Sequence, residues 1–131
     1  MALKKSAAQL VAEAKEQIEE ITAAEAVGLH GDESVVFVDL RDIRERERLG
    51  FIPGAVHCPR GMAEFWVDPD SPYYKEVFGQ PDKRYVFHCA SGWRSALTVK
   101  QLQEMGFDAT HISDGFSGWL QEGGPVQGGT A

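Results

Sequence analysis

The sequence predicts an α/β domain: a parallel sheet covered by helices on both faces. Three observations support this prediction: short runs of apolar residues, segments with helical spacing between them, and turn residues that separate the two. Strands that alternate with helices usually pair in parallel, because the intervening helix carries the chain back across the sheet. At 131 residues the chain suits one such domain with its own hydrophobic core.

The N-terminal segment, residues 1–17, is predicted to form an extra amphipathic helix docked on the domain. Apolar side chains recur there at helical spacing, with Lys, Gln and Glu between them, at Leu3, Ala7, Leu10, Val11, Ala14 and Ile18. A second short helix is expected to open at Thr22, because Glu25 completes a capping box, and to end at Gly28 or Gly31.

Four apolar runs are predicted to be strands, at residues 35–39, 55–58, 85–89 and 107–112. The first is apolar almost throughout, which is typical of a strand buried on both faces of a parallel sheet. The polar run at 41–48 predicts a short solvated helix, and its mixed charges make a binding patch the lesser alternative. Further helices are predicted at 93–105, ended by Gly106, and at 116–121.

Two segments are predicted to lack long regular elements. Residues 62–80 are rich in Pro, aromatic residues and Asp, and we expect a loop with one or two short helices there. Its aromatic residues are interpreted as core or lid packing: Trp66, Tyr73, Tyr74 and Phe78. The glycine-rich chain is expected to fray from Glu122, so that the domain spans residues 18–126 and a tail follows at 127–131.

The charge and hydropathy patterns argue against nucleic-acid and membrane partners. The formal net charge is -7, and no block of Lys and Arg stands free of acidic residues. No apolar run approaches the about 18 to 20 residues that span a bilayer. Residues 7–13 are too short, and too soon interrupted by charge, to be the core of a signal peptide. We therefore expect a cytoplasmic protein.

Cys58 and Cys89 are the only cysteines, and they do not form a C-x-x-C pair. Two cysteines and four scattered histidines make no zinc pattern, so we expect no metal site and no cofactor. In a reducing compartment such thiols stay unpaired. Cys58 is interpreted as a core thiol, with a resolving thiol that pairs with Cys89 as the alternative.

Reactive and charged side chains follow the predicted strands. The first strand ends at Asp39 and is followed by Arg41, the second is followed by Arg60, and the third ends at Cys89. Ligand sites of open parallel sheets lie beyond the carboxyl ends of the strands, so these groups are expected to converge at one edge. Asp39 is interpreted as a brace for that edge or as the partner of an arginine, with proton transfer the lesser alternative.

The strongest signal is the loop that joins the third strand to the helix at 93–105. After Cys89, the nucleophile candidate, its candidate substrate-binding residues are Ala90, Ser91, Gly92, Trp93, Arg94 and Ser95. Backbone N–H groups of such a loop point at one spot beside the positive end of a helix dipole, and they favour a thiolate over a thiol. Gly92 permits a tight turn, and Arg94 offers a planar fork to an oxyanion. Ser95 offers a hydroxyl to the substrate or caps the helix, and Trp93 is a docking point or a lid.

The chemistry that suits this loop is nucleophilic. A thiolate attacks an electrophilic sulfur and keeps it as a persulfide, which the amide groups stabilise, and a second nucleophile then takes the outer sulfur. No separate general base is expected, because the stabilised thiolate is already the reactive form. His57 and His88 stand next to the two cysteines in sequence, but alternation along a strand points them away.

With these residues in view, the chain resembles the rhodanese homology domain over residues 18–126. Four segments carry the resemblance: Asp39-Leu-Arg41, Gly50-Phe-Ile-Pro-Gly-Ala55, the loop from Cys89 to Ser95, and Asp114-Gly-Phe-Ser-Gly-Trp119. The resemblance implies a parallel five-stranded sheet and a persulfide on Cys89. Phe51 stands where the family usually has His, and Asp114 where it more often has Gly, but neither lies in the active loop.

The resemblance also implies an enzyme of the thiosulfate:cyanide sulfurtransferase type. Such an enzyme moves a sulfane sulfur from a small donor to a thiol or to cyanide. Thiosulfate, polysulfide, glutathione persulfide and a protein persulfide are all candidate donors, so a persulfide-donating protein is a candidate partner.

Two other functions are open to this fold. Protein tyrosine phosphatases need a wider loop than the four residues between Cys89 and Arg94. Arsenate reduction also uses a thiolate in a loop of this kind, so the four-residue spacing argues less strongly against it than against a phosphatase. A rhodanese-like domain can also act as a sulfur relay or a partner-binding module without turning over small molecules.

Overall fold

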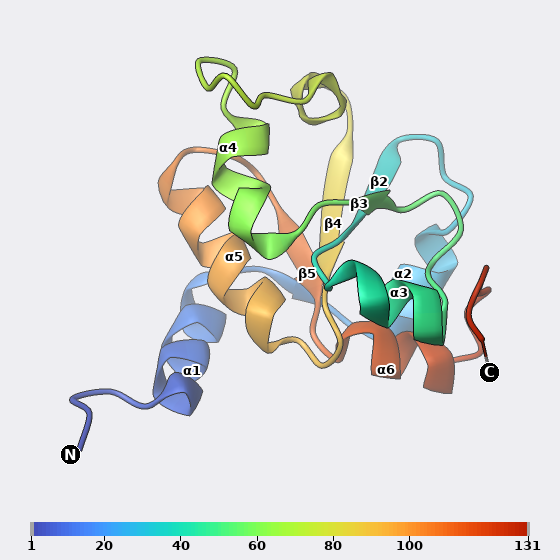
Figure 1. The fold of residues 1–131 in the computed structure, drawn as a ribbon, viewed down its shortest axis with the longest axis horizontal. Coiled ribbons are helices and arrows are strands. Elements are labelled where there is room, and N and C mark those ends of the chain that lie inside the picture. The colour runs from blue at the N-terminus through green and yellow to red at the C-terminus, as the bar shows by residue number, and fades with distance from the viewer. Residues whose placement is uncertain (1, 131) are drawn as a thin grey trace.

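The apolar runs of the sequence form one parallel sheet in the computed structural model, which describes residues 2–130 (Figure 1). The strand order is β1-β5-β4-β2-β3, and every neighbouring pair is parallel. The strands are β1 (Glu20–Ile21), β2 (Val35–Asp39), β3 (Val56–His57), β4 (Arg84–His88) and β5 (Thr110–Ile112). The expected five-stranded parallel sheet is confirmed, with β4 at its centre.

The strand at one edge of the sheet has no counterpart among the predicted strands. β1 is two residues long, so no apolar run in the sequence marks it. It pairs with β5, which places Glu20 beside His111 and Ile21 beside Ile112. This pairing brings together residues that are 91 positions apart in the chain.

Helices cover both faces of the sheet, as predicted. They are α1 (Ala7–Gln17), α2 (Ala23–Leu29), α3 (Ile43–Leu49), α4 (Ala63–Val67), α5 (Trp93–Glu104) and α6 (Gly115–Gln121), with 3-10 turns at Arg60–Met62 and Glu76–Gly79. On one face α4 and α5 pack with Phe87 of β4, and on the other α2 and α6 pack with Val86. Because adjacent residues of β4 are buried on opposite faces, this strand is apolar without alternation.

The N-terminal helix α1 packs on α5. Val11 and Ala14 are buried against Ala96, and the two helices lie side by side in Figure 1. This contact brings Nζ of Lys15 within 3.6 Å of the Glu20 carboxylate on β1. None of the described helices is long and apolar enough to cross a bilayer.

Two capping boxes fix the starts of helices near the sheet edge. The one predicted at Thr22 and Glu25 opens α2. A second, formed by Asp42 and Glu45, opens α3 and was not predicted. Since α3 has no buried residue, the interpretation of this run as a solvated helix agrees with the structure. The box also fixes the place of Glu45, which faces the candidate site.

The irregular segment at 62–80 forms α4 and a short 3-10 turn, as expected. Phe78 is buried and stacks on Tyr85 and Phe87, with ring centroids 5.8 and 6.4 Å apart. Trp66 packs against the same core. Tyr73 is exposed and meets the ring of Phe65 edge-on. The segment therefore closes one end of the core through some of its aromatic residues only.

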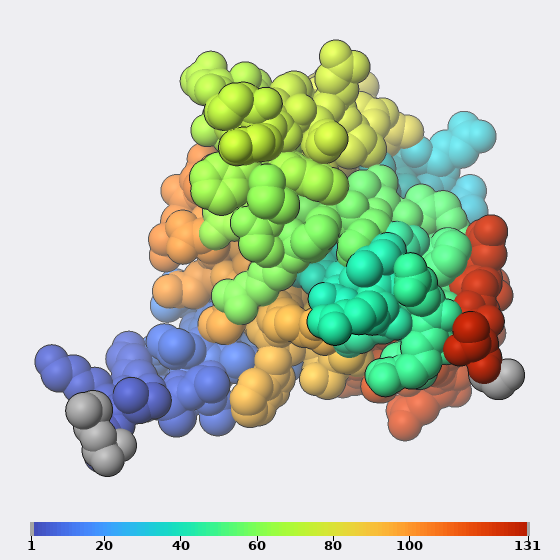
Figure 2. All heavy atoms as spheres, in the orientation of Figure 1, coloured from blue at the N-terminus to red at the C-terminus, as the bar shows by residue number. Residues whose placement is uncertain are grey.

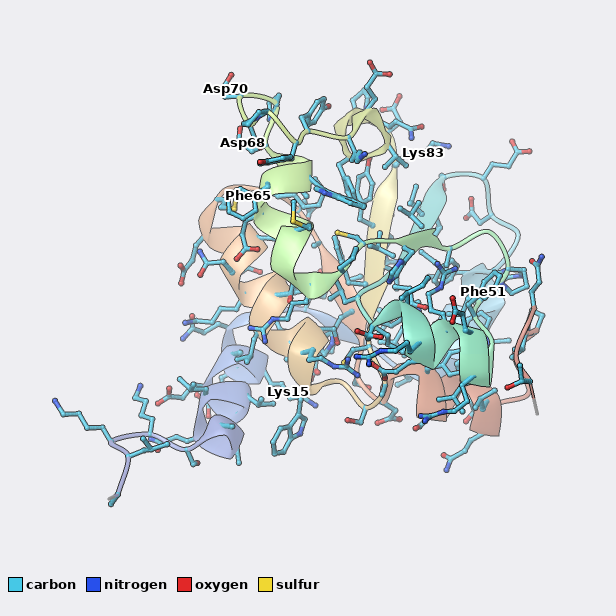
Figure 3. The ribbon with its side chains drawn as sticks, in the orientation of Figure 1. Lys15, Phe51, Phe65, Asp68, Asp70 and Lys83 are labelled. Carbon is cyan, nitrogen blue, oxygen red and sulfur yellow. The ribbon has the colours of Figure 1, made fainter. Side chains whose placement is uncertain are left out.

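The C-terminal segment is more firmly held than the sequence predicts. Gln127 pairs with Phe51 in an antiparallel bridge, with both N···O distances 2.9 Å. The Trp119 indole donates to the carbonyl of Pro125, and the amide of Thr130 donates to that of Arg48. Figure 2 shows this red segment against the green chain beside it, and Figure 3 labels Phe51 there. The expected fraying from Glu122 does not describe these residues, because their backbone groups find partners; Ala131 lies outside the described residues.

Candidate active site

Cys89 follows β4 at the carboxyl end of the central strand, and its side chain is enclosed by the next turn of chain. The residue is 1% exposed. Its sulfur accepts from the amide of Gly92 at 3.2 Å and from that of Ser95 at 3.4 Å, and it lies 3.5 Å from the Ser95 hydroxyl. Two amides and a hydroxyl at the N-terminal end of α5 form a site for a negatively charged sulfur.

This cradle requires a glycine. Gly92 has a φ of 97°, a region that residues with a side chain rarely adopt. A Cβ there would also overlap the carbonyl of Ser113, which follows β5. Gly92 therefore lets the loop bend tightly around the sulfur while packing on the neighbouring chain.

The electrostatic surroundings favour the thiolate of Cys89. Burial raises the pKa of this thiol, but the contact with the Ser95 hydroxyl and the amides of Ser95, Gly92 and Ser91 together outweigh it. The pKa of Cys89 therefore lies below its ordinary value. The thiolate is the nucleophilic form of cysteine.

The first part of the loop rests on α6. The amide of Phe116 donates to the carbonyl of Cys89 at 2.8 Å, and the amide of Ser117 donates to that of Ala90 at 3.1 Å. A Cβ on Gly115 would lie 2.7 Å from those same carbonyl groups, which explains the glycine of the closing motif. Trp93, at the start of α5, is half exposed beside the loop.

Arg94 is paired with an acid from a different element. Its guanidinium donates to both oxygens of Glu45 on α3, at 2.7 and 3.0 Å. This contact holds the pKa of Glu45 below its ordinary value. The Cys89 sulfur also faces the guanidinium, and both Glu45 and Cys89 contribute to raising the pKa of Arg94. The arginine of the loop is thus already paired with a carboxylate before any donor arrives.

Asp39 and Arg41 form a fully buried ion pair at the end of β2. Arg41 donates to the carboxylate through Nε at 3.0 Å and Nη2 at 2.8 Å, and its guanidinium lies over the ring of Phe116. Arg46 and His88 also approach Asp39, at 3.4 and 3.5 Å. The pair ties β2 to α6, which fits the interpretation of Asp39 as a brace.

Arg60 and Cys58 have surroundings that differ from those of the Cys89 sulfur. Arg60 is exposed at the start of a 3-10 turn, beside Leu97 and Lys100 of α5. Cys58 is fully buried in the apolar cluster that contains Val38. Burial and the charge of Glu64 raise the pKa of Cys58 to about 12. This environment is that of a core thiol, and both cysteines are free in the structure.

The histidines next to the cysteines in sequence point elsewhere, as alternation predicts. His57 contacts the carbonyl of Arg41 at 2.7 Å, and His88 stacks on Phe116. The histidine that reaches the site is His111 of β5, whose Nδ1 lies 2.7 Å from the Ser95 hydroxyl. His111 was not among the predicted site residues. The feature that could have indicated it is the strand register. His111 pairs with Phe87, which stands two residues before Cys89, so all three side chains lie on the same face of the sheet.

Comparisons with known proteins agree with this geometry. The family model described as "Rhodanese-like domain" matches residues 22–122. The chain belongs to the rhodanese-like domain family. The protein named "Putative sulfurtransferase YtwF" from Bacillus subtilis is 36% identical over 110 residues, which cover 83% of this chain and 97% of that one.

Two solved structures are similar over most of the fold. A Rhodopseudomonas palustris protein of unknown function, described as a "Possible Tyrosine Phosphatase", is 47% identical, with a TM-score of 0.92, and the match covers 97% of this chain and 98% of that one. A rhodanese-related protein from Thermoplasma volcanium is 26% identical, with a TM-score of 0.67, covering 83% and 97% of the two chains. The fold and the family are therefore shown, while the names of the Bacillus subtilis and Rhodopseudomonas palustris proteins refer to different chemistry.

Proposed function

We propose that the chain is a sulfurtransferase that carries a sulfane sulfur as a persulfide on Cys89. The observation that carries this proposal is the enclosed sulfur itself: a thiol with a lowered pKa, contacted by two amides and a hydroxyl at a helix N-terminus. Such a cradle stabilises a thiolate before the reaction and the terminal sulfur of a persulfide after it.

The reaction runs in two displacements. The Cys89 thiolate attacks the outer sulfur of the donor, a new S–S bond forms, and the donor's own bond to that sulfur breaks with the electron pair leaving on the remainder of the donor. A thiolate or cyanide acceptor then attacks the outer sulfur of the Cys89 persulfide. That step breaks the S–S bond and returns the thiolate, so no external oxidant or reductant is consumed.

The pairing of Arg94 favours a polysulfide or persulfide donor over thiosulfate. Thiosulfate carries a sulfonate-like end that needs a cation, and Arg94 is the cation within the loop. Because Glu45 already holds both arms of that guanidinium, thiosulfate must compete with a carboxylate for it. A polysulfide or persulfide presents its sulfane sulfur without a bulky oxyanion.

A phosphatase is the second candidate function, because the similar Rhodopseudomonas palustris protein is described as a possible tyrosine phosphatase. A phosphate group needs space above the cysteine and an arginine turned inward. In this chain Cys89 is enclosed, and Glu45 already holds both arms of the Arg94 guanidinium that a phosphate group would need, which supports sulfur over phosphate. Arsenate reduction and a sulfur relay between proteins would use the same thiolate. A cytoplasmic location remains part of the proposal, supported by two free thiols, which suit a reducing compartment.

Product assays on one enzyme preparation separate these functions. The purified protein is supplied with polysulfide or thiosulfate and with cyanide, and thiocyanate is measured; parallel samples receive a phosphate monoester or arsenate with a thiol. We expect thiocyanate from the wild type, faster with polysulfide, and none from Cys89→Ser. Phosphate release without thiocyanate would replace the proposal with the phosphatase. Loss of persulfide only to an added protein acceptor would indicate a relay.

A further inference from the structure

A chain of hydrogen bonds leads from Cys89 through the core to the surface. The sulfur lies 3.5 Å from Oγ of Ser95, which lies 2.7 Å from Nδ1 of His111. On the other side of the ring, Nε2 of His111 lies 2.7 Å from Oε2 of Glu20. Ser95 and His111 are fully buried, whereas the Glu20 side chain is 29% exposed. A buried polar network can rigidify a core, and this one, on three separate elements, also joins the Cys89 sulfur to a titratable ring.

We propose that His111 is a positioning residue that accepts the proton of Cys89 through the hydroxyl of Ser95, with Glu20 stabilising the imidazolium that results. The inference deepens the proposed function, since it concerns the same thiol. It replaces the expectation that the site needs no separate base.

The hydrogen-bond partners determine which nitrogen of the neutral ring carries the proton. A carboxylate can only accept, so the Glu20 contact places the proton on Nε2 of His111. Nδ1 then accepts from the Ser95 hydroxyl, and the Ser95 oxygen accepts from the S–H of Cys89. Every donor therefore points from Cys89 toward His111.

Proton movement along this chain leaves no atom unaccounted for. The Cys89 proton passes to Oγ of Ser95 as the proton of that hydroxyl passes to Nδ1 of His111. The S–H and O–H bonds break, and new O–H and N–H bonds form. The products are a thiolate, an unchanged serine hydroxyl that now donates to the sulfur, and an imidazolium held by the Glu20 carboxylate.

The charged groups around the ring suit an acceptor that rests in its neutral form. Burial lowers the pKa of His111, the carboxylate of Glu20 opposes that effect, and Lys15 adds to the lowering. Lys15 is labelled in Figure 3 and comes from α1, which packs beside α5. The pKa of His111 therefore lies below its ordinary value, and a carboxylate stands beside the ring to stabilise a positive charge on it.

The charged groups that face Cys89 come from two further helices. Arg94 of α5 favours the thiolate directly, and Glu45 of α3 offsets part of that charge. Asp39 of β2 pairs with His88 of β4, the residue before Cys89. Because neighbouring residues of a strand point to opposite faces, these two side chains lie on the other face of the sheet from Cys89. The sulfur therefore has a positive neighbour, Arg94, and a hydrogen-bonded route to a base, through Ser95.

Alkylation of Cys89 across pH tests the inference without any sulfur donor. The rate with iodoacetamide reports the thiolate fraction, and Cys58→Ala in all samples leaves one reactive thiol. His111→Asn keeps an amide near the position of Nδ1 but cannot take a proton. We expect the alkylation pKa to rise by about one unit, so that the rate near pH 7 falls about tenfold and the rates converge near pH 10. An effect on access to the sulfur would lower the rate equally at every pH.

Two further variants keep the test decisive. Glu20→Gln, at the surface end of the chain, should shift the profile in the same direction by a smaller amount. His30→Asn, a partly buried histidine that contacts the Pro53 carbonyl instead, is the matched control and should leave the profile unchanged. If the rate–pH profiles of both Glu20→Gln and His111→Asn superimpose on that of His30→Asn, the inference is overturned. If His111→Asn fails to fold, Glu20→Gln alone decides.

The proton route and the proposed function can fail independently of each other. A pKa shift in His111→Asn, in a protein that never loads sulfur, would keep the inference and reject the sulfurtransferase. Sulfur loading with an unshifted profile would do the reverse.

Discussion

Replacement of Glu45 by Gln should make the chain a better user of thiosulfate. The carboxylate of Glu45 holds both arms of the Arg94 guanidinium, and it also accepts from the amide of Asp42 to close the capping box of α3. Glutamine serves in a capping box as well as glutamate does. The substitution therefore weakens the ion pair while keeping the helix start intact.

The size of the effect follows from the exposure of the pair. The Arg94 and Glu45 side chains are 36% and 24% exposed, so solvent screens their attraction. Pairs near the surface contribute up to about 1 kcal/mol, and a bidentate geometry belongs at the upper end of that range. Since about 1.4 kcal/mol corresponds to a factor of ten, release of Arg94 should raise kcat/KM for thiosulfate about fivefold.

The assay is thiocyanate formation with thiosulfate and with polysulfide as donors. We expect the polysulfide rate to change less than about twofold, because that donor does not need Arg94. The thiosulfate gain should shrink as salt is added, because salt screens the same attraction. Glu47→Gln, an exposed position of the same helix with the same change of charge, is the control. Equal gains for both donors, or an equal gain from Glu47→Gln, would refute the role given to Glu45.

Two further substitutions test the supports of the site. Gly92→Ala should lower the free energy of unfolding in urea by about 2 to 5 kcal/mol, because it combines a left-handed backbone with overlap against Ser113. Gly106→Ala has a similar φ with open space around it, so it should cost only about 1 to 2 kcal/mol, and equal losses would contradict the packing argument. Asp39→Asn should cost about 3 to 5 kcal/mol near pH 7, because it leaves Arg41 buried without its partner. Burial raises the pKa of Asp39, but the contacts with His88 and Arg41 lower it by more than burial raises it. The pKa of Asp39 in the folded protein therefore lies below that in the unfolded chain. The contribution of Asp39 to the free energy of unfolding is thus present above about pH 4 and lost as the pH falls toward its folded pKa. In urea unfolding, the stability of Asp39→Asn should therefore depend less on pH in that range than the stability of the wild type. Parallel plots of stability against pH for the two proteins would contradict this.

Local sequence patterns were sufficient to predict four of the five strands and the loop after Cys89. The buried strand from Val35 to Asp39 and the loop after Cys89 are both continuous in the chain, so their composition reports their structure directly. The capping box of Thr22 and Glu25 was predicted for the same reason.

Contacts between distant segments could not be predicted in this way. β1 is too short to show a pattern, and its pairing with β5 is what carries Glu20 to His111. The partner of Arg94 depends on where α3 packs, and the anchoring of Gln127 depends on the path of Phe51. Each of these contacts depends on strand order or on helix packing, which no local spacing encodes.

The chemical form of Cys89 after exposure to a donor tests the proposed function most directly. The reduced protein is treated with polysulfide, its intact mass is measured, and cyanide is then added, with Cys58→Ala and Cys89→Ser alongside. One additional sulfur on the wild type and on Cys58→Ala, absent from Cys89→Ser and removed by cyanide, is the predicted result. An unchanged mass, or an added sulfur that persists in Cys89→Ser, would contradict the assignment of Cys89 as the sulfur carrier.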